Sequence, residues 1–87
     1  MKEPTRVIMT EVTSPYGKYT AFNVKGTGRL VGEVDRRGRN YVVFCNGHNV
    51  GQRSNKDSAI AHAKKCISEV LPNPVEFKWN VMSYKEK

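Results

Sequence analysis

The sequence contains few of the residues on which catalytic sites and membrane spans depend. Its 87 residues include two cysteines, two histidines and eight acidic residues, and no apolar run approaches the ~18 residues of a membrane-spanning helix. The acids form no paired motif, and no Gly-rich phosphate loop is followed by Lys-Ser/Thr and a helix. Neither histidine has a Ser or Cys nucleophile with an acidic orienter nearby in sequence. We therefore predict that the protein is not an enzyme.

The short chain also limits the size of the core. A chain of 87 residues is expected to form one domain, here residues 1–87, and to bury only ~60% of the surface that its unfolded form exposes. Residues 1–4 lack the apolar segment of a signal peptide, so a cytoplasmic location is expected. In that compartment Cys45 and Cys66 are expected to stay reduced.

What the sequence has in excess is positive charge. Fifteen Lys and Arg residues against eight Asp and Glu residues give a formal net charge of +7. Such a charge on a small surface attracts polyanions and speeds their encounter with the protein. Nucleic acid is the first partner that this predicts, and an acidic protein surface is the alternative. Positive charge can also serve solubility alone.

The first half of the chain is predicted to form short strands joined by turns. β-Branched and aromatic residues recur over residues 6–13, 18–24, 29–35, 41–45 and 48–52, and Gly or Pro separates most of these stretches. Asn46-Gly47 accepts positive φ at both positions and predicts a two-residue hairpin. In that hairpin Cys45 is expected opposite His48, and Val43 opposite Val50.

The second half is predicted to contain one helix and one further strand. Ser54 is the expected N-cap, and Pro72 ends the helix. Val75 to Val81 alternate as a half-buried strand. Residues at helical spacing form the expected buried stripe: Ala59, Ile60, Ala63, Cys66, Ile67, Val70 and Leu71. The aromatic residues expected in the core are Phe22, Phe44, Phe77 and Trp79. The predicted fold class is α+β, an antiparallel β-meander of four to five short strands with one helix packed on it and a C-terminal strand.

All four Cys and His residues fall at a spacing that suits a metal. The pattern is Cys45-x2-His48, thirteen residues, then His62-x3-Cys66, which places one pair on the hairpin and the other one turn apart on the helix. Residues 41–66 resemble a C2H2-type zinc finger, with the second and fourth ligand types exchanged and Gln52 or Arg53 in place of the expected aromatic. The resemblance implies a tetrahedral zinc site with zinc as cofactor. The alternative is that these residues are a buried small hydrophobe and ordinary turn and helix residues.

The basic residues suggest where a polyanion binds. Those expected to contact phosphates lie before, in and after the Arg-rich turn and at the helix N-terminus: Arg29, Arg36, Arg37, Arg39, Arg53 and Lys56. Tyr16, Tyr19 and Tyr41 are candidates for base stacking. The predicted function is that of a small nucleic-acid-binding accessory protein of phage or bacterial type. The alternatives are a protein-interaction module or inhibitor that docks its basic face on an acidic partner, and a homodimer formed through a sheet edge.

Overall fold

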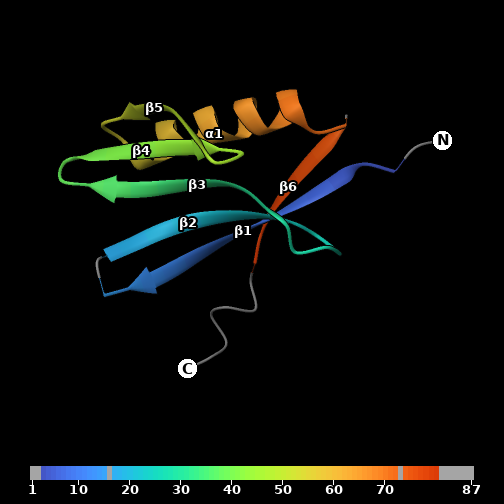
Figure 1. Ribbon diagram of the computed structural model, residues 1–87, viewed down its shortest axis with the longest axis horizontal. Coiled ribbons are helices and arrows are strands. Elements are labelled where there is room, and N and C mark those ends of the chain that lie inside the picture. The colour runs from blue at the N-terminus through green and yellow to red at the C-terminus, as the bar shows by residue number, and fades with distance from the viewer. Residues whose placement is uncertain (1–2, 16, 73, 81–87) are drawn as a thin grey trace.

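The described part of the chain forms one mixed sheet of six strands with a single helix packed on it, as the α+β prediction requires (Figure 1). The computed structural model describes residues 3–15, 17–72 and 74–80. The elements are β1 (Thr5–Ser14), β2 (Gly17–Val24), β3 (Leu30–Arg37), β4 (Asn40–Cys45), β5 (His48–Arg53), α1 (Lys56–Val70) and β6 (Val75–Trp79). Within these residues no helix is both long and apolar enough to cross a membrane.

The strand order is β5-β4-β3-β2-β1-β6. The first five strands form an antiparallel meander, and α1 then carries the chain back across the sheet so that β6 pairs in parallel with β1. This last pairing joins two segments that are far apart in sequence, such as Thr5 and Val75. The parallel crossover places β5 at one edge of the sheet and β6 at the other.

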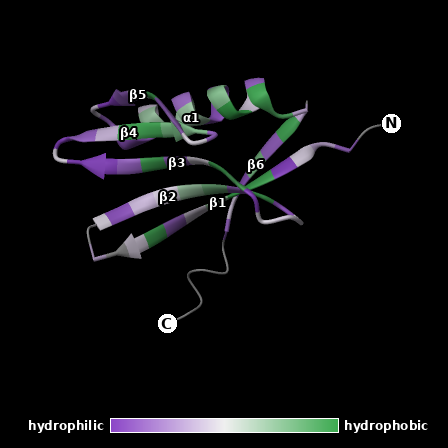
Figure 2. Ribbon diagram, viewed as in Figure 1, coloured by the Kyte–Doolittle hydropathy of each residue, from purple (hydrophilic) through white to green (hydrophobic). Residues whose placement is uncertain are grey.

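The core lies between α1 and one face of the sheet. The helix packs on β3, β4 and β5, and its buried residues are Ala59, Ile60, Ala63 and Ile67. They meet Phe22, Val34 and Val43 from the sheet, which are at most 2% exposed. The approach is close at Gly32, where a Cβ atom would lie 2.8 Å from Ile67 Cδ1. Figure 2 shows that the β3–β4 turn is mostly hydrophilic, whereas hydrophobic residues concentrate where the helix meets the strands.

The ends of the helix differ slightly from the prediction. Asn55, not Ser54, is the N-cap, because its Oδ1 accepts from the Ser58 backbone N–H at 3.1 Å. At the other end the Leu71 N–H donates to the Ile67 carbonyl, and Pro72 follows. Val70, predicted in the buried stripe, is 56% exposed.

The Asn46-Gly47 hairpin is confirmed, with φ of 54° and 84° at its two residues and Cys45 opposite His48. The predicted pairing of Val43 with Val50 is wrong, since Val43 lies opposite Gly51. A β-bulge adds one residue to β5 and shifts the register from there on. Gly51 supports the irregular backbone with a φ of 137°, and its N–H donates to the Asn49 side chain at 2.9 Å.

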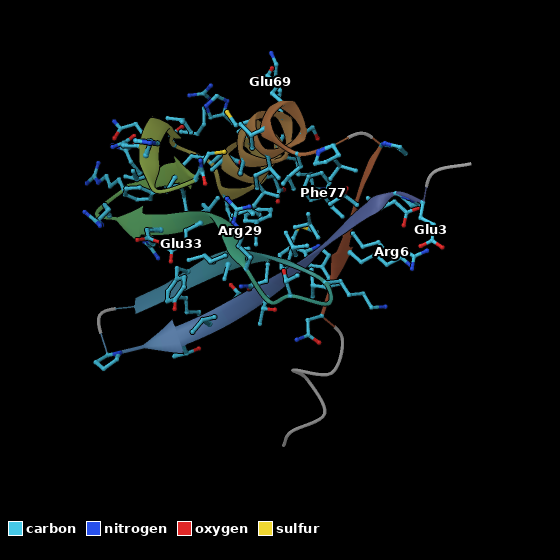
Figure 3. The ribbon with its side chains drawn as sticks, turned by 45° about the vertical axis from the view of Figure 1, so that its right-hand side comes forward. Glu3, Arg6, Arg29, Glu33, Glu69 and Phe77 are labelled. Atoms are coloured by element: carbon cyan, nitrogen blue, oxygen red, sulfur yellow. The ribbon has the colours of Figure 1, made fainter. Side chains whose placement is uncertain are left out.

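The C-terminal strand is confirmed over Val75–Trp79, and Val81 lies outside the described residues. Phe77 packs against the core and meets Phe22 edge to face, with ring centroids 6.2 Å apart. Figure 3 shows Phe77 between the helix and the strands. Trp79, however, is 43% exposed, so its prediction as a core residue is wrong. Alternation gives it the same face as Phe77, but β6 carries it past the region that α1 covers.

Candidate functional site

A pocket of about 230 Å³ opens on the helix side of the sheet, next to the N-terminus of α1. The hairpin ends of β1 and β2 extend past the helix there (Figure 1), so their helix-side residues are left uncovered. We call this pocket the cationic groove. Its lining residues are Glu11, Lys18, Tyr19, Thr20, Val34, Arg36, Tyr41 and Lys56.

Sheet register explains why most of these residues meet, whereas Tyr19, the partner of Asp35, alternates toward the other face. Glu11 on β1 lies opposite Thr20 on β2, and Thr20 lies opposite Val34 on β3. Side chains two residues apart share a face, so Lys18 and Arg36 project on the same side as Thr20 and Val34. Tyr41 is the β4 partner of Arg36. Four strands thus contribute to one surface.

The charge of the groove is mainly positive, with three cationic side chains against one carboxylate. Lys56 Nζ lies 2.6 Å from Glu11 Oε2, and both side chains are about two-fifths exposed. Arg36 Nε donates to the Gly38 carbonyl at 3.2 Å, which holds the guanidinium beside its own turn. Lys56 is also the first residue of α1, where the helix dipole adds partial positive charge.

The groove combines predicted residues with others that the sequence analysis missed. Arg36 and Lys56 were expected phosphate contacts, and Tyr19 and Tyr41 were stacking candidates; Tyr16 lies outside the described residues. Lys18 was not singled out. The signal for it was present in the alternation of β2, which places Lys18 on the same side as Thr20.

The remaining predicted arginines lie elsewhere. Arg37 points to the opposite sheet face, where its Nη2 lies 3.7 Å from Asp35 Oδ2. Arg53 donates to the Gln52 carbonyl at 2.7 Å, and Arg29 to the Asn46 side chain at 3.3 Å. Arg39 is exposed in the β3–β4 turn. The Arg-rich turn is therefore divided between the two faces of the sheet.

The Cys and His residues lie on the hairpin and the helix as expected. Among them, His62 forms a contact that joins the helix to the sheet. His62 Nε2 lies 2.9 Å from the Val50 carbonyl, and its Nδ1 lies 3.4 Å from Arg53 Nη2. These partners indicate a proton on Nε2 and a lone pair on Nδ1 that is directed at a cation. Gly51 permits this contact, because a Cβ there would lie 3.3 Å from the ring. His62 thus attaches α1 to β5.

Cys66 lies one helical turn after His62, and its Sγ is 3.8 Å from His62 Nε2. Both cysteines are free thiols, and burial, followed by the nearby Cys66 and Glu69, raises the pKa of Cys45. His48 is exposed. Among the described residues no three His, Cys, Asp or Glu side chains are placed to hold a metal ion. The zinc site predicted from spacing finds no support, and we do not propose it.

The sheet face away from α1 carries two neighbouring acidic side chains. Glu33 and Asp35 lie side by side on β3, and Figure 3 shows Glu33 on the side away from the helix. Burial, and then the neighbouring Asp35 charge, raise the pKa of Glu33. Asp35 Oδ1 is buried without a hydrogen-bond partner among the residues that the structure describes. A proton held by Glu33 therefore relieves both the repulsion and the missing hydrogen bond.

Comparison with protein families, curated proteins and solved structures finds no significant match to this chain. The geometry of the groove is therefore the basis for any functional proposal.

Proposed function

We propose that the protein is a nucleic-acid-binding module and not an enzyme, and that its cationic groove contacts the phosphate backbone. The observation that carries the proposal is the convergence of Lys18, Arg36 and Lys56 on one open pocket at the start of α1. The three residues come from three separate elements, so a run of charge in the sequence does not explain their meeting.

The chemistry of the groove suits phosphate. The guanidinium of Arg36 can donate paired hydrogen bonds to one phosphate, and lysines act as mobile point charges. The net charge of +7 adds long-range attraction for a polyanion. Binding of this kind releases counterions, so the affinity falls linearly in log salt.

Glu11 provides the sharpest test, because it is the one carboxylate in the groove and already neutralises Lys56. Glu11→Gln should raise the affinity for an oligonucleotide about threefold at about 0.1 M salt, since Lys56 is then available to a phosphate. The pair is partly exposed, so its loss should cost at most about 1 kcal/mol of stability. Fluorescence anisotropy across a salt series measures both the affinity and the slope.

Glu76→Gln is the matched control. It changes the net charge by the same amount, but Glu76 pairs with Arg6 at 3.6 Å, on the opposite sheet face and about 16 Å along β1 from Glu11. At 0.1 M salt that separation exceeds the Debye length of about 10 Å. Equal gains from both variants would assign binding to net charge alone, and the groove would not be the site.

A further inference from the structure

The only tryptophan of the chain lies exposed near the groove. Trp79 pairs with Met9 across the β6–β1 ladder and is 43% exposed. Glu11 follows Met9 by two residues on the same face of β1, so the Cα atoms of Trp79 and Glu11 lie about 8 Å apart. Glu11 in turn binds Lys56 at 2.6 Å. The indole is therefore on the surface that leads into the groove.

Two lysines contact residues that neighbour this tryptophan on the same face. Lys64 of α1 lies over the ring of Phe77, 5.7 Å from its centroid, and Phe77 precedes Trp79 by two residues on the same face. Lys56 lies next to Glu11. An exposed aromatic ring near two lysines combines a surface for base stacking with contacts for the adjacent phosphates.

The outward side of α1 does not suit a DNA duplex. Its exposed residues include Asp57 and Glu69 together with Lys65, so the helix offers no uniformly basic surface to a major groove. A duplex also keeps its base faces stacked on each other, whereas unpaired bases can stack on an aromatic side chain.

From these observations, and resting on the proposed function, we infer that the groove takes single-stranded nucleic acid, with one base stacked on Trp79, the neighbouring phosphates on Lys56 and Lys64, and a more distant phosphate of the same strand on Arg36. Phosphate contacts then supply most of the salt dependence, and stacking supplies a preference for strands that carry bases.

Trp79 reports on its own contact, because the full chain contains no other tryptophan. Wild-type protein is titrated with three probes of about 12 nucleotides: a thymidine oligonucleotide, an abasic oligonucleotide of equal charge, and a DNA duplex. The thymidine strand should quench the indole emission and bind on the order of tenfold more tightly than the abasic strand. Equal affinity for these two strands without quenching, or tighter binding of the duplex, would overturn the inference and leave the proposed function standing. Binding to none of the three would instead defeat the proposed function.

Trp79→Ala should lower the affinity for the thymidine strand to that for the abasic strand and leave abasic binding unchanged. Leu30→Ala is the control, since Leu30 is a similarly exposed apolar residue, at 48%, and should alter neither affinity. Circular dichroism checks that each variant is folded. The comparison of strands on the wild type needs no variant, so it stands even if Trp79→Ala does not fold. Retention of the thymidine preference in a folded Trp79→Ala protein would contradict the stacking contact.

Discussion

At the same end of the molecule, the two faces of the sheet differ in their charged side chains and in how far the helix covers them. On the helix side Lys18, Arg36 and Lys56 surround the groove, whereas on the other face Glu33 and Asp35 lie beside Arg37. Arg36 and Arg37 are neighbours in sequence and yet belong to different surfaces. Because successive side chains of a strand point to opposite faces, a run of charged residues is divided between two electrostatic environments. The net charge of a sequence segment therefore does not locate a binding site.

The largest expected effect is on stability, and it compares a phenylalanine on the helix-covered face of the sheet with one on the opposite face. Phe22 lies on the helix side and is fully buried, whereas Phe44, which pairs with Glu33, is half-buried on the other face. Phe22→Ala should reduce the free energy of unfolding by about 3–5 kcal/mol, and Phe44→Ala by about 1 kcal/mol. Urea unfolding midpoints measure both. Similar losses would mean that the face opposite the helix is as enclosed as the core.

The next effect tests the division of the basic turn. Replacing Lys18 and Arg36 with Ala should weaken oligonucleotide binding on the order of tenfold and reduce the slope of log affinity against log salt by about 1.4 for a single strand. The double variant Arg37→Ala with Arg39→Ala removes the same charge from outside the groove and should change both quantities much less. If the second pair proves equally damaging, the turn acts as a whole and the faces do not differ in binding.

The smallest effect concerns the acidic face. The native pKa of Glu33 is raised above its usual value of 4.5. Between pH 4.5 and the native pKa, the native state therefore binds more protons than the unfolded state. The stability that Glu33 contributes is thus present below pH 4.5 and is lost as the pH rises through the native pKa. Glu33→Gln should stabilise the protein at pH 7 by less than about 1 kcal/mol.

Thermal melts between pH 4 and pH 7 on the order of half a unit apart check this prediction. The gain from Glu33→Gln should vanish at the acid end, where wild-type Glu33 is itself neutral. Glu76→Gln, which loses an exposed ion pair with Arg6, should give no gain at any pH. A constant gain across the range would trace the effect to packing rather than to ionisation.

Parts of the fold that depend on short-range pattern could be predicted. Asn46-Gly47 tolerates the positive φ of its turn, and Ala59, Ile60, Ala63 and Ile67 repeat at the helical period, so the hairpin and the buried helix face follow from neighbouring residues. The bulge in β5 was missed because it depends on how Asn49 and Gly51 satisfy one backbone N–H. The candidate site was half predicted, since Arg36 and Lys56 were identified but not brought together with Lys18.

The sequence by itself determined the α+β class, the extent of the helix and the excess of positive charge, because composition and periodicity are local properties. The tertiary structure decided which charges meet. Only the parallel pairing of β6 with β1 places Trp79 beside Met9 and near Glu11, and only the position of α1 over β3, β4 and β5 leaves the groove open. Likewise, Cys45 and His62 belong to a sequence spacing that suits metal ligands, but in the packed structure His62 contacts the backbone carbonyl of Val50. Such contacts join residues distant in sequence, and their geometry is fixed when helix and sheet pack together.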